Sequence, residues 1–225
     1  MSTSIKLPGV DSERFDVIKR HLYTAVLGDI LDEIGRLHQF LPEEVRPLVN
    51  SMKVVGRAMP VLSRDTHGVT DTPFGRMTEA LDQLQPGEVY LAAAAGSHAA
   101  MWGEIMTATA KYRGAAGAVV AGFHRDTFAV IEQDFPVFSR GAYALDSRPR
   151  LGVVDFRVRA EIGNVVVKPG DLVVGDVDGV LVIPRDVETE VLERALTKVM
   201  QENSARQLIE SGVSSTDVLR QKGIL

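Results

Sequence analysis

Cysteine is absent from this chain of 225 residues. That absence excludes a thiol nucleophile, a zinc or iron–sulfur site with cysteine ligands, and a framework of disulfides. It also favours an intracellular protein, and we expect the cytoplasm as its location. A domain of this length buries enough apolar surface to fold without a metal or a disulfide to stabilise it.

An excess of basic residues is also lacking, because 25 Lys and Arg stand against 30 Asp and Glu, a formal net charge of −5. Nucleic-acid binding proteins usually carry a basic excess or a basic stripe, so we expect no nucleic-acid partner. No apolar run approaches the ~18 residues of a membrane span, and the N-terminus lacks the apolar core of a secretory signal. These absences predict a protein that acts on small anions or on other proteins, without a membrane partner.

The residues that are present have the composition of an ordinary globular protein, with 45% hydrophobic residues, 20 Gly and 10 Pro. Their patterns predict a single α/β domain over residues 1–225, in which helices flank a mixed sheet. Two helices are expected over 11–35, a central β-α-β unit over 87–126 and a long amphipathic helix over 186–212. The stretch 64–76, rich in Asp, Thr, Gly and Pro, is expected to form a loop.

The central unit is the most regular part of the sequence. A buried strand over 87–94 precedes a helix from about Trp102 to Arg113, which Gly114 ends, and a second buried strand follows over 116–121. A strand, a helix and a strand at this spacing form a right-handed parallel crossover. In such a crossover the start of the helix and the end of the second strand reach the same sheet edge, where ligands commonly bind.

Charged residues occur at both of these positions. Arg125 and Asp126 directly follow the second strand, and Glu104 lies at the start of the helix. Arginine offers planar donors to a carboxylate or an enolate oxygen, and aspartate is a hard oxygen ligand for Mg²⁺ or Mn²⁺. The free N–H groups of Ile105 and Met106 can hold a substrate carboxylate, so the set suits a 2-oxo acid and its enolate. The alternatives are a solvated Arg–Asp pair and an acid that only stabilises the helix.

Three other side chains are weaker candidates. Glu202 interrupts the apolar stripe of the C-terminal helix, so it either reaches solvent, meets a partner subunit or lines a site. His98 and His124 lie in loops beside the expected site, where either is a candidate acid or base. Each of the three has a purely structural alternative.

The same segments carry a family resemblance. Segments 102–104 and 119–126, Trp-Gly-Glu and Val-Val-Ala-Gly-Phe-His-Arg-Asp, resemble the signature of the class II 4-hydroxy-4-methyl-2-oxoglutarate aldolases and of the related regulator of ribonuclease activity A. That signature is a glycine, three residues, an acid, twenty residues and then Arg-Asp, and twenty residues separate Glu104 from Arg125. The resemblance extends over about residues 20–210.

The chain departs from this signature at two positions. Glu104 stands where the aldolases typically have aspartate, and Ala100 stands where the pattern has glycine. Because glutamate reaches one methylene further than aspartate, the first departure bears on metal geometry and on the choice of substrate.

The resemblance implies a swivelling-domain-like α/β fold that assembles as a homotrimer or homohexamer, with sites at subunit interfaces. It implies that Asp126 ligates Mg²⁺, Mn²⁺ or another divalent metal directly. Glu104, and Glu202 from a neighbouring subunit, would hold metal-bound water.

Substrate binding is assigned by the same resemblance to Gly103, to Arg125 and to the amides of Ile105 and Met106. The implied reaction is a lyase reaction that cleaves a 4-hydroxy-2-oxo acid, such as 4-hydroxy-4-methyl-2-oxoglutarate, to pyruvate. Arg125 would stabilise the enolate, and a metal-activated water would accept the proton of the 4-hydroxyl. Decarboxylation of oxaloacetate passes through the same enolate and is expected as a second activity. The groups beyond the pyruvate unit are expected to contact the loop 64–76.

The alternative function is that of a non-catalytic regulator that binds a ribonuclease or another protein. That subgroup tends to lack the second acid, which this chain keeps as Glu104, so catalysis is the favoured hypothesis. A methyltransferase, a label sometimes attached to this family, lacks support because the chain has no glycine-rich nucleotide loop.

Overall fold

A mixed sheet forms the centre of the molecule in the computed structural model, which describes residues 7–69, 71–93, 96 and 98–223. Within these residues the sheet has eight strands in the order β1-β7-β5-β3-β2-β11-β12, and β8 pairs with β2. The strands are β1 (Arg46–Pro47), β2 (Val54–Asp65), β3 (Glu88–Ala93), β5 (Gly117–Val120), β7 (Val137–Ser139), β8 (Leu151–Phe156), β11 (Leu172–Asp176) and β12 (Gly179–Ile183).

The sheet combines a parallel centre with antiparallel flanks. Strands β2, β3, β5 and β7 run parallel, as the predicted crossover between β3 and β5 requires. Strands β1, β8, β11 and β12 pair antiparallel to their neighbours. The sheet is nearly closed, because β1 lies against β12 and Arg46 donates a hydrogen bond to the carbonyl of Val177 at 3.4 Å.

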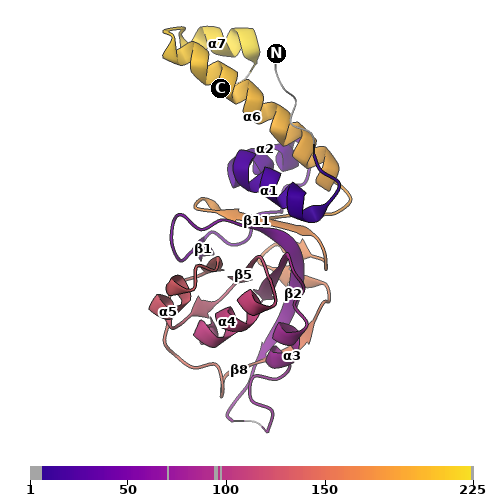
Figure 1. The fold of residues 1–225 in the computed structure, drawn as a ribbon, viewed down its shortest axis with the longest axis vertical. Helices are drawn as coiled ribbons and strands as arrows, with labels where there is room; N and C mark the ends of the chain where they lie inside the picture. Colours follow the sequence, from indigo (N-terminus) through magenta and orange to yellow (C-terminus); the bar gives the residue numbers. More distant parts are fainter. Residues whose placement is uncertain (1–6, 70, 94–95, 97, 224–225) are drawn as a thin grey trace.

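The helices cover the sheet in two groups (Figure 1). They are α1 (Asp11–His21), α2 (Thr24–Glu33), α3 (Met77–Asp82), α4 (Glu104–Tyr112), α5 (Thr127–Glu132), α6 (Glu188–Glu210) and α7 (Ser215–Lys222). Helices α1 and α2 lie between α6 and the sheet, where they share an apolar core with β11 and β12. Helices α3 and α4 contribute to a second core on the side of β3, β5 and β8. In the part of the chain described, no helix has both the length and the apolar character to cross a membrane.

The predicted β-α-β unit is present, with one correction at the start of its helix. Helix α4 begins at Glu104, because Trp102 belongs to a short strand, β4 (Ala100–Trp102). The helix stops before Gly114 as predicted, and the φ of +76° at Gly114 is a left-handed backbone conformation that favours glycine. Ala94, the expected end of the first strand, lies outside the described residues.

Several short elements were not predicted from the sequence. They include α3, α5, α7, the strand β6 (Phe123–His124) and the strand β9 (Ala160–Ile162), which forms a hairpin with β10 (Val165–Val167), a strand expected near 163–168. The two N-terminal helices and the C-terminal helix are confirmed, since α6 spans Glu188–Glu210 within the expected range of 186–212. Strand β2 reaches Asp65, so the loop that follows is shorter than predicted.

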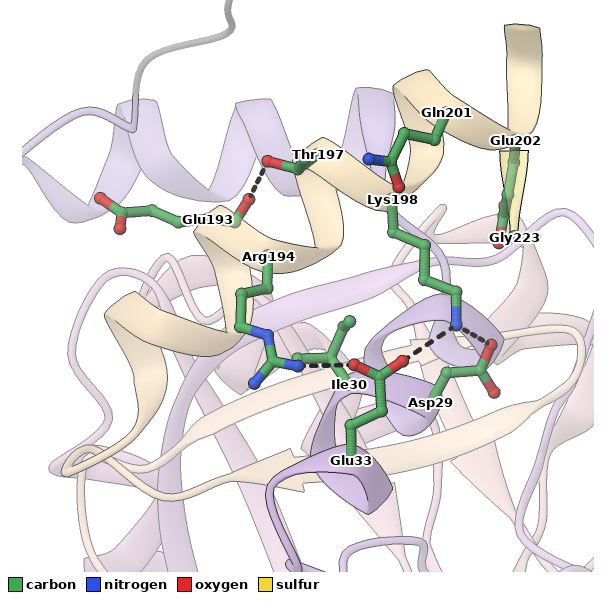
Figure 2. A pocket seen from close by; sticks show the side chains of 10 residues that line it. All are labelled: Asp29, Ile30, Glu33, Glu193, Arg194, Thr197, Lys198, Gln201, Glu202 and Gly223. Atoms are coloured by element: carbon green, nitrogen blue, oxygen red, sulfur yellow. Dashed lines mark hydrogen bonds and ion pairs between the residues drawn. The ribbon is translucent and has the colours of Figure 1, made fainter. Parts of the chain in front are cut away.

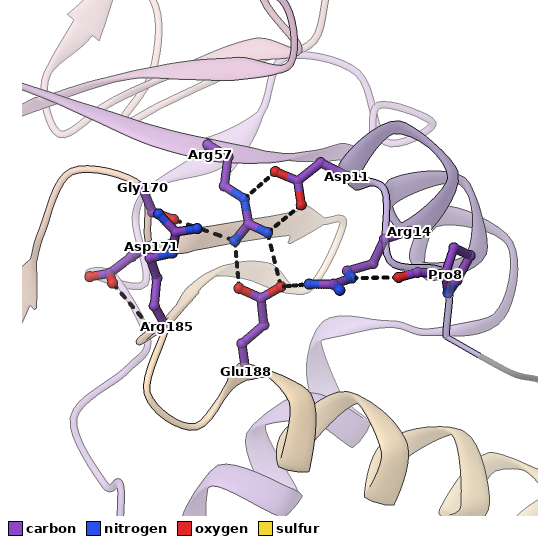
Figure 3. Close-up of polar contacts among 8 residues, drawn as sticks. All are labelled: Pro8, Asp11, Arg14, Arg57, Gly170, Asp171, Arg185 and Glu188. Carbon is purple, nitrogen blue, oxygen red and sulfur yellow. Dashed lines mark hydrogen bonds and ion pairs between the residues drawn. The ribbon is translucent and has the colours of Figure 1, made fainter.

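A partly buried cluster of charges joins α1, β2 and the start of α6 (Figure 3). The guanidinium of Arg57 donates to both carboxylate oxygens of Asp11, at 2.7 and 2.5 Å, and to both of Glu188, at 2.5 and 3.0 Å. Arg14 donates to Glu188 at 2.7 Å. These contacts tie together three elements that are distant in sequence.

Candidate active site

Two short strands bring the predicted site residues together. Strands β4 and β6 pair in parallel with Trp102 opposite His124, and the N–H of Arg125 donates to the carbonyl of Trp102 at 2.9 Å. The residues that follow each strand therefore leave this ladder side by side. Glu104 and Asp126 emerge as neighbours, which is the juxtaposition that the crossover predicts.

These residues line one cavity of about 420 Å³. A volume of this size is typical of pockets for small molecules. Its described lining residues are Phe74, Met77, Thr78, Leu81, Asp82, Ala100, Trp102, Gly103, Glu104, Ile105, Met106, Thr109, Arg125, Asp126 and Ser147. The cavity thus contains all the candidates from the central unit except the two histidines.

Asp126 is held in an uncommon backbone conformation. Its φ of 59° and ψ of 35° are left-handed, and it lies at the N-cap of α5. One carboxylate oxygen, Oδ2, accepts a hydrogen bond from the N–H of Glu104 at 3.3 Å. Gly103 leaves room for this carboxylate, because a Cβ at that position would lie 2.7 Å from Oδ2. The backbone conformation of Asp126 and the absence of a side chain at Gly103 together place the Asp126 carboxylate beside the first turn of α4.

Arg125 lies between two carboxylates. Its Nε is 3.6 Å from Asp126 Oδ2, and its Nη1 is 3.2 Å from Asp146 Oδ1. Its side chain is 40% exposed, so the guanidinium remains accessible from the cavity. An arginine held at both sides presents its planar donors in a fixed orientation, which suits a carboxylate or an enolate.

The first turn of α4 completes the anion-binding side of the cavity. The N–H groups of Ile105 and Met106 belong to that turn, where backbone donors have no partner within the helix. Together with the helix dipole they favour a negative charge at this position. The site therefore combines one guanidinium and one helix N-terminus, and both can donate hydrogen bonds to an anion.

The donors also permit a divalent cation. Among the described residues, no group of three or more His, Cys, Asp or Glu side chains could hold a metal by itself. Mg²⁺ does not need such a group, because it commonly binds through one or two carboxylates and keeps several waters or substrate oxygens. Asp126 and Glu104, which both line the cavity, fit a cation bound in this way.

The two histidines lie outside the lining of the cavity among the residues described. His98 is exposed and stacks on Phe123, with ring centroids 6.0 Å apart. His124 is buried, its ring nitrogens lie 2.7 Å from Ser139 Oγ and 3.0 Å from Thr127 Oγ1, and burial lowers its pKa. Its contacts give His124 a structural role beside the site.

Glu202 lies in a different cavity of the same chain, of about 580 Å³, between α2 and α6 (Figure 2). There it accepts a hydrogen bond of 2.5 Å from the hydroxyl of Tyr23. Burial, reinforced by Glu202, raises the pKa of Tyr23 to about 12. Ion pairs from Lys198 to Asp29 at 2.8 Å and from Arg194 to Glu33 at 2.6 Å cross the same cavity. The chain by itself does not bring Glu202 to Arg125 and Asp126.

Sequence reasoning missed one wall of the site. From the predicted loop 64–76 only Phe74 lines the cavity among the described residues, and α3 supplies Met77, Leu81 and others. Asp146, which holds Arg125, was also missed. A helix of six residues and a loop acid carry no distinctive pattern, so no signal in the sequence identifies them.

The fold is a nearly closed α/β sheet, and its cavity brings together an arginine, carboxylates and a helix N-terminus, an arrangement whose donors suit a small anion. The model of the RraA-like family, described as Aldolase/RraA, matches residues 24–182. The chain therefore belongs to this family.

Similar proteins carry two kinds of name. The chain is 32% identical over 208 residues to a protein of Halalkalibacterium halodurans that is provisionally named 4-hydroxy-4-methyl-2-oxoglutarate aldolase, covering 91% of this chain and 93% of that protein. RraAS2 of Streptomyces coelicolor, described as an unusual member of the RNase ES inhibitor RraA family, is 29% identical with a TM-score of 0.78, covering 88% and 97%. An uncharacterized protein from Pseudomonas syringae pv. tomato is 29% identical with a TM-score of 0.84, covering 98% and 99%.

Proposed function

We propose that this protein is a divalent-metal-dependent lyase that cleaves a 4-hydroxy-2-oxo acid to pyruvate. Decarboxylation of oxaloacetate through the same enolate is the proposed second activity. The observation that carries the proposal is the placement of Arg125 and Asp126 beside the first turn of α4 in a single cavity. The aldolase name of a relative that matches most of the chain supports it.

In the proposed reaction the chain binds the pyruvyl end of the substrate. The N–H groups of Ile105 and Met106 hold the carboxylate, and Arg125 donates to the 2-oxo oxygen. As the bond between C3 and C4 breaks, its electron pair forms the enolate, whose negative oxygen Arg125 stabilises. The 4-hydroxyl loses its proton to a water beside Glu104, and protonation of C3 then gives pyruvate.

Asp126 and Glu104 are the residues that would hold Mg²⁺ or Mn²⁺, Asp126 directly and Glu104 through water. A bound divalent cation would polarise the 2-oxo group and disperse the charge of the enolate. The third proposed contributor, Glu202, lies in the other cavity of its own chain. We propose that it acts from a neighbouring subunit of a homotrimer or homohexamer.

A coupled assay of pyruvate release tests the proposed function. The substrates are oxaloacetate, 4-hydroxy-4-methyl-2-oxoglutarate and its monocarboxylate analogue 4-hydroxy-4-methyl-2-oxopentanoate, each with Mg²⁺ and with a chelator. We expect turnover of at least one aldol substrate, and chelation to lower it by about 100-fold or more, since the cation disperses transition-state charge. Restoration by added Mg²⁺ is the control. Absence of metal-dependent pyruvate release from all three would refute the proposal.

A substitution of Gly103 tests whether the position of the Asp126 carboxylate matters for the reaction. Gly103→Ala keeps an extended backbone, with φ of −165°, but places its Cβ against Asp126 Oδ2. We expect kcat/KM to fall by about tenfold or more, because small misplacements of site groups are costly. Thermal stability should change little, since the carboxylate is 44% exposed and can turn aside. The matched control is Gly9→Ala, where an added Cβ meets nothing within 4 Å. Equal activity of the two variants would contradict the assigned role of Asp126.

The alternative function, a regulator that binds a ribonuclease or another protein, is favoured by the description of the Streptomyces coelicolor relative. It is distinguished by Asp126→Ala, which removes a carboxylate from the cavity. Capture of a ribonuclease by both the wild type and this variant, without pyruvate release by either, would support the regulator.

A further inference from the structure

One wall of the cavity that contains Arg125 is apolar. Phe74, Met77 and Leu81 come from α3 and the residues before it, and Ile105 and Met106 come from α4. Helices α3 and α4 lie against each other, so these side chains belong to one continuous surface. Met77 and Leu81 are four residues apart and therefore share a face of α3.

Cationic side chains are scarce among the described residues that line this cavity. Arg125 is the sole cation among the described lining residues, whereas Asp82, Glu104 and Asp126 are acidic. Arg113 lies nearby but pairs with Asp82 at 3.1 Å on the exposed rim. The one cationic side chain of the described lining therefore belongs to the end of the cavity that receives the 2-oxo acid, and there it already contacts Asp126 and Asp146. A second substrate carboxylate would meet acids and apolar carbon along the rest of this lining.

Burial of an unpaired carboxylate is unfavourable, and neighbouring acids add to the cost. Burial of methyl and methylene groups against Met77 and Leu81 is favourable. The cavity volume of about 420 Å³ leaves room beyond a three-carbon pyruvyl unit for such a group. The cost of burying a carboxylate, the gain from burying apolar groups and the available volume all favour a substrate whose far end is apolar.

We propose that the preferred substrate is a monocarboxylate, a 4-hydroxy-2-oxo acid whose group beyond C4 is uncharged and apolar. This inference rests on the proposed function, because it takes the 2-oxo acid to lie at Arg125. Cleavage of such a substrate breaks the bond between C3 and C4 and yields pyruvate and an aliphatic aldehyde or ketone. Met77 and Leu81 are the specificity-determining residues, since they line the wall that the apolar group contacts.

The test uses binding first, because the chain has a single tryptophan, Trp102, and it lines this cavity. Its fluorescence is titrated in the full-length protein with Mg²⁺ and two 2-oxo acids that differ only in a methyl or a carboxylate at C4. These are 2-oxopentanoate and 2-oxoglutarate. We expect 2-oxopentanoate to bind about tenfold more tightly, and affinity to rise about fourfold per methylene from 2-oxobutanoate to 2-oxohexanoate.

A charge placed on the apolar wall should reverse this preference. Met77→Lys keeps a long unbranched side chain and supplies a cation for the second carboxylate, so 2-oxoglutarate should bind about tenfold more tightly than in the wild type. Gln83→Lys is the matched control, because it adds the same charge at the end of the same helix on an exposed residue outside the cavity lining. It should leave the ratio of the two affinities unchanged.

Measurement of turnover distinguishes the proposed specificity from the proposed lyase function. With 4-hydroxy-4-methyl-2-oxopentanoate and 4-hydroxy-4-methyl-2-oxoglutarate, we expect kcat/KM to favour the monocarboxylate by about tenfold. Equal or tighter binding of 2-oxoglutarate, or no binding of either 2-oxo acid, would overturn the inference. A preference for 2-oxopentanoate that Met77→Lys reverses, without pyruvate release from any substrate, would support the specificity of the cavity and refute the lyase.

Discussion

Arg125→Lys is expected to lower kcat/KM for pyruvate release by about 100-fold to 1,000-fold, because loss of one stabilising donor in a comparable site has effects of that size. The charge is retained, so the loss would come from geometry. Lysine has no planar fork, and it cannot reach the substrate oxygen while it contacts both Asp126 and Asp146 as Arg125 does. Steady-state kinetics with the preferred substrate measures the change.

The matched control is Arg159→Lys. Arg159 is 61% exposed and pairs with Glu161 at 2.7 Å on the β9 side of the molecule, away from the cavity lining. Its replacement should leave kcat/KM within about twofold, because exposed ion pairs contribute little. If Arg125→Lys also stayed within that range while folding normally, Arg125 would have no part in stabilising the enolate.

The second large effect is on stability. Glu188→Gln is expected to lower the free energy of unfolding by about 3 kcal/mol, because it leaves buried guanidinium groups without their carboxylate. The side chains of Glu188 and Arg57 are only 5% and 13% exposed, and Arg14 also depends on Glu188. Chemical denaturation measures the change. Glu190→Gln is the control, since Glu190 lies in the same first turn of α6 but pairs on the surface with Arg194.

The same contacts give the stability difference a definite dependence on pH. Burial works against the charged form of Glu188, but hydrogen bonds from Arg57 and Arg14 outweigh it, so its pKa is held below the ordinary value of 4.5. A carboxyl whose pKa is lowered by folding contributes stability above its ordinary pKa and loses it as pH falls through the lowered value. The difference between wild type and Glu188→Gln should therefore be full at pH 7 and shrink below pH 4.5. A difference that does not vary with pH would exclude the charge of Glu188 as its cause.

Regular patterns in the sequence predict most of the fold. The apolar runs that became β3 and β5, and the helix between them that Gly114 ends, are long enough for their periodicity to be distinctive. The three residues of β4 and the less than two helical turns of α5 are too few for a pattern to be recognised. Their formation depends on the contacts of the folded chain, as in the pairing of Trp102 with His124.

Some features of the candidate site are also predictable from the sequence, and others are not. The proximity of Glu104 and Asp126 follows from crossover topology, and a hydrogen bond of 3.3 Å now joins the N–H of one to the carboxylate of the other. Asp146 and Met77 reach the cavity only because distant segments pack together. His124 sits next to the site in sequence, yet its side chain turns to Ser139 and away from the cavity lining. Sequence adjacency does not determine side-chain direction.

The left-handed backbone of Asp126 has a consequence for the evolution of this protein. A non-glycine residue held there costs about 1 kcal/mol or more, although aspartate tolerates the conformation better than most residues do. Glycine would relieve that strain and abolish the carboxylate at the same time. Laboratory selection for heat resistance alone would thus favour loss of the carboxylate on which the proposed activity depends, and only a screen that also demands that activity would retain the acid.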